Sequence, residues 1–379
     1  MPEREHLVIV LSWHGRHDTL RCVDSLVAGS PATDVLVVDN GSDDGVLDAV
    51  TERWPHVATL QTGDNLGFAG GMDRGLAWGL ERGYGLLTVL NNDTLVDPGA
   101  LDRLAALATA GAVAASPRIV RLGAGPDGAG DGDLWFAGAV LDDVDGLPRH
   151  RSAAEAAAEL AAGEPFGADL LTGCCVCATA ATWRHVGGFD ARYFLDFEDS
   201  DWSLRARQRG VRLVVDPGAV VRHRVSASFT GPASYLGTFY YARNALLLAG
   251  RWHASGVRRW GVLRHRVLPR PVRTWRDHGP REGLRTAVVV ATALAAHVVG
   301  AHGRAPRALE VLAATWAARA RRRADQTAQA DQADQAADQA ADQAADQAAE
   351  PAAGEGRVES APGRGENALE PLGALSPPD

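Results

Sequence analysis

The chain has 379 residues and is 46% hydrophobic, which is enough for a large globular core and one or two domains. Its net charge of −9 is unevenly distributed, with −12 on residues 1–250, +13 on residues 251–323 and −10 on residues 324–379. Four cysteines are too few for a disulfide scaffold, so the composition excludes a small disulfide-stabilised secreted domain.

The N-terminal segment MPEREH leads directly into an apolar run, so we expect no signal peptide and a cytoplasmic location. Four apolar runs have the length of buried strands: residues 7–12, 34–39, 57–62 and 85–91. Helical patterns follow these runs, near residues 17–28, 44–53, 67–82 and 98–109. This alternation predicts an α/β fold, with a mostly parallel sheet and helices on both faces. Ligands of such sheets bind at the carboxyl ends of the strands.

Asp39 ends the second predicted strand, in the sequence VVDNGSDDG. Its carboxylate can accept hydrogen bonds from a nucleobase or a ribose, although the same pattern is typical of an ordinary Asx turn. Asn65 and Gly70 lie in DNLGFAGGMDRGL, where glycines permit close approach of a bulky ligand. This pattern is not G-x-G-x-x-G, so it gives a dinucleotide-binding fold little support.

Asp93 follows the fourth predicted strand, in the sequence VLNNDTLVDPGAL. A carboxylate at a strand end can hold a divalent cation such as Mg²⁺ together with substrate phosphates. A plain turn before the helix that begins near Asp97 explains the same residues equally well.

The segment YFLDFEDSDWSLRARQRG concentrates negative charge against aromatic rings. It contains four carboxylates within six residues: Asp196, Glu198, Asp199 and Asp201. Acidic residues suit the first turn of a helix, where the backbone dipole is positive. A catalytic base is the second explanation, since apolar neighbours raise the pKa and the basicity of a carboxylate. His223 follows a further predicted strand and is either structural or a ligand.

Residues 251–323 are rich in arginine and contain an apolar run at 286–301 that is short for a membrane span. We expect a buried or interfacial helix there. The positive charge and the residues Trp252, Trp260 and Trp275 favour a peripheral contact with an anionic membrane surface. A solvated basic surface is the alternative. The ADQA repeats within 324–379 predict a disordered or marginally helical tail.

Seven motifs occur in order along the chain: VIVLSWHG, VLVVDNGSDDG, NLGFAGGMDRGL, VLNNDTLVDPGAL, LTGCCVCATAATWRHVGGFDARYFLDFEDSDWSLRARQRG, VVRHRVSAS and YYARNALLL. Together they resemble the family-2 glycosyltransferases with the GT-A fold, in the rhamnosyltransferase-like subgroup of bacterial cell-surface polysaccharide synthesis. The resemblance covers roughly residues 6–250. It implies an inverting transfer of a rhamnose-like sugar or another hexose from a nucleotide-diphosphate donor to a hydroxyl of a lipid-linked or cell-envelope glycan.

The resemblance also implies roles for individual residues. Asp93 binds Mg²⁺ or Mn²⁺ on the donor diphosphate, and His223 completes this metal or diphosphate site. Asp199 is the base that takes the proton of the acceptor hydroxyl. Glu198 and Asp201 are further candidates for the base, because spacing does not rank the three carboxylates.

Donor binding is expected from residues at the strand ends: Ser12, His14, Asp39, Asn65, Gly70 and Asn92. Among them, Asp39 inherits the nucleotide contact of the family. The segment 12–14 reads Ser-Trp-His where the family commonly has Asn-Tyr-Asn, and 91–93 reads Asn-Asn-Asp at the D-x-D position. Trp202 is expected to stack on the apolar face of the acceptor sugar.

These assignments predict a catalytic domain over 1–250, an arginine-rich helical region over 251–323 and the tail over 324–379. We expect a location at the inner face of the cell membrane and no nucleic-acid partner. A non-catalytic glycosyltransferase-like scaffold is the main alternative function. An oxidoreductase built on the Gly-rich turn and a sugar nucleotidyltransferase are further alternatives.

Overall fold

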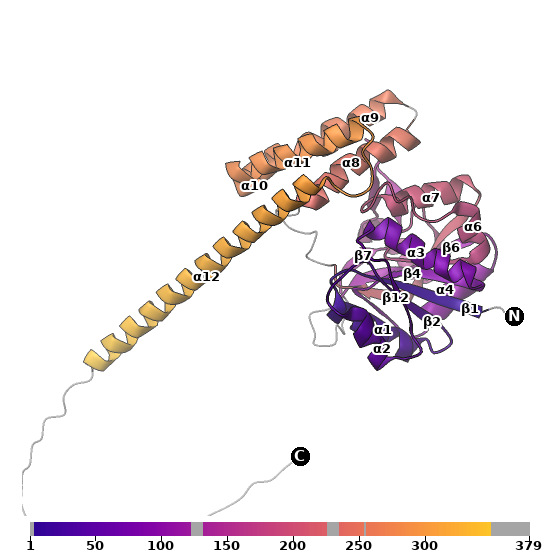
Figure 1. Ribbon diagram of the computed structural model, residues 1–379, viewed down its shortest axis with the longest axis horizontal. Helices are drawn as coiled ribbons and strands as arrows, with labels where there is room; N and C mark the ends of the chain where they lie inside the picture. The colour runs from indigo at the N-terminus through magenta and orange to yellow at the C-terminus, as the bar shows by residue number, and fades with distance from the viewer. Residues whose placement is uncertain (1–3, 123–131, 226–234, 254, 350–379) are drawn as a thin grey trace, which may run out of the picture. The chain divides into compact units, whose positions relative to one another are not determined.

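The computed structural model describes residues 4–122, 132–225, 235–253 and 255–349 (Figure 1). Its larger strands are β1 (Arg4–Ser12), β2 (Asp34–Asp39), β3 (Ala58–Gln61), β4 (Tyr84–Asn91), β6 (Val113–Arg121), β11 (Cys175–Thr179) and β12 (Arg212–His223). Its shorter strands are β5 (Thr94–Val96), β7 (Leu134–Phe136), β8 (Ala139–Leu141), β9 (Pro148–His150) and β10 (Phe166–Gly167).

The helices before the acidic segment are α1 (Arg16–Gly29), α2 (Val46–Arg53), α3 (Gly67–Glu81), α4 (Ala100–Thr109), α5 (Ala153–Ala162) and α6 (Ala180–Val186). Those from the acidic segment onward are α7 (Glu198–Gln208), α8 (Tyr235–Trp252), α9 (Gly256–Val262), the π-helix η1 (Leu263–Val267), α10 (Arg270–His278), α11 (Pro280–Val298) and α12 (Arg307–Ala349).

The main sheet has the strand order β10-β12-β6-β11-β4-β1-β2-β3. Strands β4, β1, β2 and β3 are parallel neighbours, whereas β11 runs antiparallel to both β4 and β6. Right-handed crossovers place α1 and α2 on one face, and the reversed direction from β3 to β4 places α3 on the other, as Figure 1 shows. The predicted mostly parallel sheet with helices on both faces is confirmed.

The predicted strands form the core of this sheet because their side chains are apolar on both faces. Residues 7–10 of β1 and 36–38 of β2 are completely buried. All four cysteines are also buried, and none of them forms a disulfide. The central strands of the sheet are therefore buried on both faces, whereas the edge strand β3 is only partly buried.

A second apolar cluster lies among the C-terminal helices. It joins α8 to α11, with Phe239 and Leu248 on α8 and Val289, Val290 and Ala293 on α11 all buried. The apolar run 286–301 is thus mostly part of α11, and it packs against protein on one face. No helix in the described ranges is long and apolar enough to cross a membrane.

The chain divides into two compact units, Met1–Ala318 and Arg319–Asp379. The expected domain boundary at residue 250 falls inside α8. Within the predicted tail, residues 324–349 continue the helix α12, and residues 350–379 lie outside the described ranges.

Candidate active site

Asp93 and His223 meet at the carboxyl edge of the sheet. Asp93 lies in the turn between β4 and β5, and His223 is the last residue of β12. Because β5 pairs antiparallel with β12, with Thr94 opposite His223, the two side chains are brought together. His223 Nε2 lies 3.0 Å from Asp93 Oδ1, and both side chains are almost buried.

The other ring nitrogen of His223, Nδ1, is buried without a hydrogen-bond partner among the described residues. The His223 ring packs edge-on against Trp135 at 4.6 Å between centroids. Trp135 also contacts the ring of His150 at 4.8 Å. His150 in turn lies within electrostatic reach of both His223 and Asp199. This aromatic cluster links the Asp93–His223 pair to the acidic segment.

Asp199 lies in the first turn of α7 and faces the same edge of the sheet. Its Oδ2 accepts a hydrogen bond from the backbone N–H of Gly173 at 3.0 Å. The next residue, Cys174, bonds through its carbonyl to the backbone N–H of Asn91 at the end of β4. Burial raises the pKa of the Cys174 thiol well above its usual range, and the carboxylates of Asp93 and Asp199 raise it further. Asp93 and Asp199 therefore both lie near Cys174.

Glu198 is 6% exposed, and its Oε2 has no hydrogen-bond partner among the described residues. Burial raises the pKa of Glu198 well above its usual range, and the nearby Asp199 and Asp196 carboxylates raise it further. Burial therefore favours the protonated form of Glu198, and its carboxyl group is enclosed by protein. Asp199 is only half-buried, and its Oδ1 accepts hydrogen bonds from the backbone N–H and the hydroxyl of Ser200 at 2.6 and 3.1 Å.

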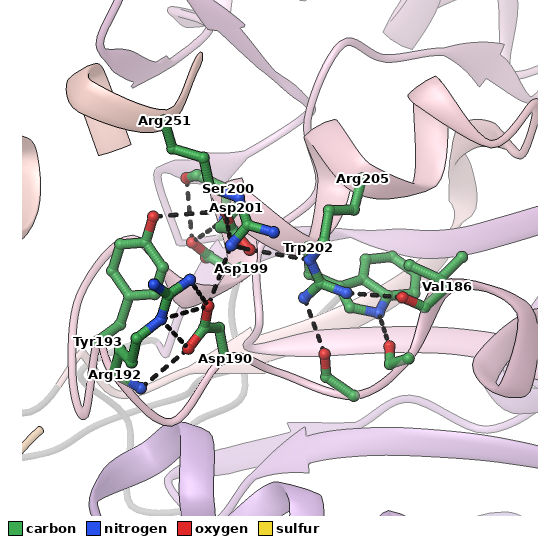
Figure 2. A network of polar contacts seen from close by, with 12 residues as sticks. Val186, Asp190, Arg192, Tyr193, Asp199, Ser200, Asp201, Trp202, Arg205 and Arg251 are labelled. Carbon is green, nitrogen blue, oxygen red and sulfur yellow. Dashed lines mark hydrogen bonds and ion pairs between the residues drawn. The ribbon is translucent and has the colours of Figure 1, made fainter. Parts of the chain in front are cut away.

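Asp201 is fully buried at the centre of a polar network (Figure 2). Its carboxylate lies 2.9 Å from Arg205 and 3.2 Å from Arg251. The indole N–H of Trp252 and the hydroxyl of Tyr193 also donate hydrogen bonds to it, at 2.9 and 3.4 Å. A carboxylate held by two cations and two further donors joins α7 to α8. This position does not fit the predicted role of a base that reaches a substrate.

Trp202 is 1% exposed and lies in the core. Its ring packs against Trp183 at 4.7 Å and near Phe189. Its N–H, drawn in Figure 2, donates to the carbonyl of Gly187. The predicted stacking of Trp202 on an acceptor sugar does not fit this position, because protein atoms cover both faces of the ring. The period of the helix turns Trp202 toward the core. The acidic residues next to it in the sequence suggested instead that this segment faces a substrate.

Asp39 ends β2 and is buried. Its Oδ1 accepts a hydrogen bond from the backbone N–H of Ser42 at 3.1 Å, and its Oδ2 accepts one from Gln61 at 2.6 Å. The bond to Ser42 reaches the third residue on, whereas a plain Asx turn bonds the second, so Asp39 holds the turn by a wider side-chain bond than the one predicted. The same carboxylate stands at the carboxyl edge where a nucleotide is expected, so the two interpretations are compatible.

Asn65 shapes the glycine-rich loop. Its side-chain oxygen accepts hydrogen bonds from Asn40 at 3.2 Å and from the backbone N–H of Gly67 at 2.8 Å. Gly70 follows in the first turn of α3, where a Cβ would approach Leu66 Cβ to 2.9 Å. Asn40, which sequence reasoning missed, is the residue that ties this loop to the end of β2.

Ser12 and Asn92 lie beneath the edge of the sheet. Ser12 is fully buried, and its hydroxyl accepts a hydrogen bond from Thr19 at 2.8 Å. Asn92 donates to the same Thr19 hydroxyl at 2.9 Å, so these two predicted donor ligands face the protein. His14 has a left-handed backbone conformation with φ of 49° and a half-exposed ring near Asp43. Among the three, His14 alone presents its side chain outward.

The loop before α7 is strained. Phe194, Asp196 and Phe197 have φ values of 66°, 68° and 72°, a conformation that is costly for residues other than glycine. A Cβ on Gly67, itself at φ 74°, would lie 2.3 Å from the carbonyl oxygen of Phe194. The glycine-rich loop and the acidic loop therefore touch through their backbones.

Two buried side chains of α8 hold this strained loop. The amide of Asn244 donates to the carbonyl oxygens of Tyr193, Leu195 and Asp196 at 2.8, 2.7 and 3.1 Å. The guanidinium of Arg243 donates to Tyr193 at 3.0 Å and also to the carbonyls of residues 192 and 303. Sequence reasoning assigned neither residue a role, although both stand in the motif YYARNALLL.

One pocket lies beside the Asp93–His223 pair and a larger one lies at the opposite edge of the sheet. A small one of about 10 Å³ lies beside Asp93 and is lined by Asp18, Arg21 and Arg224 among others. A larger one of about 630 Å³ lies at the amino ends of β6 and β12, around Phe166 and Arg212. The larger pocket contains none of the predicted site residues.

The donor atoms at the edge suit a divalent cation held jointly with a substrate. Within the described ranges no group of three or more His, Cys, Asp or Glu side chains is arranged to hold a metal ion. Asp93 and His223 supply one carboxylate and one imidazole with an unpartnered nitrogen. Mg²⁺ and similar hard cations are usually bound by one or two carboxylates plus substrate phosphates, so this limited donor set fits such an ion.

A protein-family model described as "Glycosyltransferase like family 2" matches residues 2–236. The chain belongs to this family. The N-acetylglucosaminyl-diphospho-decaprenol L-rhamnosyltransferase of Mycobacterium tuberculosis is 30% identical over 248 residues, which are 61% of this chain and 80% of that protein. The undecaprenyl-phosphate mannosyltransferase of Micrococcus luteus is 41% identical over 95 residues, 24% of this chain and 38% of that protein.

Among solved structures, the mannosyltransferase PcManGT from Pyrobaculum calidifontis in complex with GDP-Man and Mn²⁺ is similar. It has a TM-score of 0.46 and 16% identity, over 84% of this chain and 82% of that chain. The predictions of a family-2 glycosyltransferase and of a rhamnosyltransferase-like relationship are confirmed. The fold is the mostly parallel α/β sheet expected of the GT-A class.

Proposed function

We propose that this glycosyltransferase moves a hexose, rhamnose or a similar sugar, from a nucleotide-diphosphate donor to a hydroxyl of a lipid-linked or cell-envelope glycan. The transfer inverts the anomeric centre. The acceptor class is suggested by two relatives whose names include a decaprenol-linked and an undecaprenyl-linked substrate. The proposed place of the reaction is the cytoplasmic face of the membrane, where the enzyme would meet a lipid-linked acceptor.

The observation that carries this proposal is the position of Asp199 relative to the Asp93–His223 pair. Asp199 accepts a hydrogen bond from the backbone N–H of Gly173, and the next residue, Cys174, is bonded through its carbonyl to Asn91 at the end of β4, two positions before Asp93. Ligands of open α/β sheets bind at this carboxyl edge of the sheet. A donor diphosphate near Asp93 would therefore present its sugar toward Asp199.

The chemistry assigned to Asp199 is proton abstraction. An Oδ of Asp199 takes the proton of the acceptor hydroxyl while the hydroxyl oxygen forms a bond to the anomeric carbon of the donor. The bond between that carbon and the diphosphate oxygen breaks, and the diphosphate leaves with the electron pair. The backbone N–H of Gly173 holds Oδ2, and the backbone N–H and hydroxyl of Ser200 hold Oδ1, so both oxygens of the carboxylate are oriented by the protein.

The leaving diphosphate is the second place where charge develops. A divalent cation bound at Asp93 and His223 would neutralise negative charge on the diphosphate. Asp93 holds its carboxylate at the strand end, and His223 fixes it by the 3.0 Å contact. Asp39 lies at the end of β2, where its carboxylate and the turn at Ser42 are expected to contact the nucleoside.

The proposal is tested by sugar transfer from a panel of nucleotide sugars to a polyprenyl-linked acceptor, with Mg²⁺ or Mn²⁺ present. Asp199→Asn should lower kcat by roughly 10²–10⁴-fold, because a general base contributes about that factor. Asp169→Asn, a half-exposed carboxylate that pairs with Arg207, is the matched control and should retain activity.

The results separate the alternatives. Near-normal turnover by a folded Asp199→Asn protein would place the base elsewhere. Metal-dependent binding of a nucleotide sugar without any transfer or donor hydrolysis by the wild-type chain would favour the non-catalytic scaffold.

A further inference from the structure

An exposed stripe of apolar side chains runs along the segment from α9 to α10. Its members recur every three or four residues, with Arg264 filling the middle position, and are 81%, 57%, 46%, 73% and 55% exposed: Val257, Trp260, Leu268, Val272 and Trp275. The helices α9, η1 and α10 follow one another with helical dihedrals at the junction residues 268 and 269. Since a helix repeats every 3.6 residues, this spacing places the stripe on one face.

The opposite face of this segment is anchored to the rest of the unit. Val262 and Val267 are fully buried. Arg266 pairs with Asp142 at 3.2 Å and also with Asp145. The guanidinium of Arg270 lies 3.8 Å over the ring of a tyrosine on α8. These contacts fix the stripe outward, so its apolar side chains are not needed for the packing of the segment itself.

The stripe is flanked by positive charge. Residues 256–278 contain seven arginines and a single acidic residue, Asp277, which pairs with Arg276. The exposed arginines beside the stripe are Arg258, Arg259, Arg264, Arg273 and Arg276. A second copy of the chain docked on this face would set arginine against arginine, which is unfavourable. An anionic partner with an apolar interior fits both the charge and the side chains.

Two other features in this region do not contribute to the stripe. The N–H of Trp252 donates to Asp201, so its polar edge is turned toward the acidic segment. The apolar run of α11 buries Val289 and Val290 against α8. The surface proposed below is therefore restricted to the face formed by α9, η1 and α10.

We propose that this stripe docks on an anionic lipid bilayer. Trp260 and Trp275 lie at the headgroup level, where an indole ring matches the boundary between apolar and polar layers. The valines and the leucine of the stripe enter the acyl boundary, as in helices that lie in a membrane interface. The arginines contact the lipid phosphates. The inference rests on the proposed function in one respect, that the acceptor is held in this membrane.

The test is co-sedimentation of the full chain with vesicles of phosphatidylcholine alone or with phosphatidylglycerol. Wild-type protein should bind the anionic vesicles and release at high salt. The double variant Trp260→Ser/Trp275→Ser should bind at least 10-fold more weakly. Arg258→Gln/Arg259→Gln should weaken binding by about 5-fold for each arginine removed. Trp13→Ser removes a 47% exposed tryptophan at the sheet edge and should bind as wild type.

Three results would overturn the proposal. The first is equal binding of wild type to neutral and anionic vesicles, and the second is unchanged binding by both double variants. The third is a dimer in light scattering that the tryptophan variant dissociates, which would assign the face to a second copy. Sugar transfer to a soluble acceptor analogue, measured in parallel, separates failure of this surface from failure of the proposed reaction. Normal transfer without vesicle binding would reject the surface alone.

Discussion

His223 and Asp93 are 130 positions apart in the chain, and their side chains lie 3.0 Å apart. The contact follows from the sheet, because β12 returns antiparallel to β5 and places the last residue of one strand beside the turn before the other. Two ordinary strand-end residues therefore form a pair that suits a cation and a diphosphate. The same edge carries Asp199, and the predictions below concern how these groups are held and used.

Asp93→Asn should remove the metal dependence of donor binding. A bound cation contributes several kcal/mol of charge stabilisation in such transfers, so kcat should fall by about 10²-fold or more. The measurement is thermal stabilisation by nucleotide sugars with and without Mn²⁺, together with the transfer rate. Asp97→Asn, which breaks the nearby pair with Arg222, is the control and should keep the metal response. An unchanged Mn²⁺ response in Asp93→Asn would contradict the assignment.

Asp201→Asn should destabilise the fold. Its carboxylate is buried against two arginines, and removing one partner of such a pair costs about 3–5 kcal/mol. Urea unfolding measures the effect. Transfer by the folded fraction at low temperature should be reduced far less than in Asp199→Asn. A stable Asp201→Asn protein with no activity would show instead that Asp201 is the base.

Asp196 should make stability depend on pH. Burial and then the neighbouring Asp199 raise the pKa of Asp196 from an ordinary 3.8 to about 6. The folded protein thus holds this proton more tightly than the unfolded chain. The associated stability is fully present below about pH 4 and is lost as the pH rises through 6.

Asp196→Asn keeps the side chain neutral at every pH. Its free energy of unfolding should match wild type near pH 4 and exceed it by roughly 1–3 kcal/mol at pH 8. Urea unfolding between pH 4 and pH 8 gives both curves, and Asp169→Asn serves as the background. Parallel curves for Asp196→Asn and wild type would rule out a raised pKa at this position.

Asn244→Ala should loosen the loop that carries the acidic residues. It removes the amide donor of the carbonyl oxygens of Leu195 and Asp196, while that of Tyr193 keeps its bond from Arg243, at a cost of about 1–3 kcal/mol. Because the strained loop positions Asp199, kcat should fall while donor affinity, read by thermal shift, changes little. Leu248→Ala on the same helix should cost a similar 2–5 kcal/mol in stability but spare kcat at low temperature. Equal kcat for both variants would leave Asn244 with a purely structural role.

Much of the sheet could be predicted from the sequence, because buried parallel strands are continuous apolar runs and their ends are marked by Asp39, Asn91 and Asp93. The roles of individual site residues were harder to predict, because they depend on which side chains are buried. The acidic residues 198, 199 and 201 look equivalent in the sequence, yet the helix buries Glu198 and Asp201 and leaves Asp199 half-buried. Trp202 is buried as well. The 3.6-residue period of this short helix could have shown which of these side chains face the core.

The contribution of α8 could not be predicted in the same way. Arg243 and Asn244 act on backbone carbonyls about 50 positions earlier, and hydrogen bonds to backbone leave no pattern in side-chain types. The exposed stripe of α9 and α10 is the opposite case. The spacing of three and four residues between the members of the stripe is visible in the sequence. Only the structure shows that Val262 and Val267 on the opposite face are buried, so that the stripe faces outward.

The central claim is that Asp93, His223 and Asp199 surround one bound donor. It is tested most directly by a crystal structure grown with Mn²⁺ and the nucleoside diphosphate of the most stabilising nucleotide sugar. The account predicts an anomalous manganese peak bonded to the carboxylate of Asp93 and to the diphosphate, with Asp199 facing the same ligand. A manganese ion and nucleotide bound elsewhere, such as in the pocket around Phe166, would contradict it.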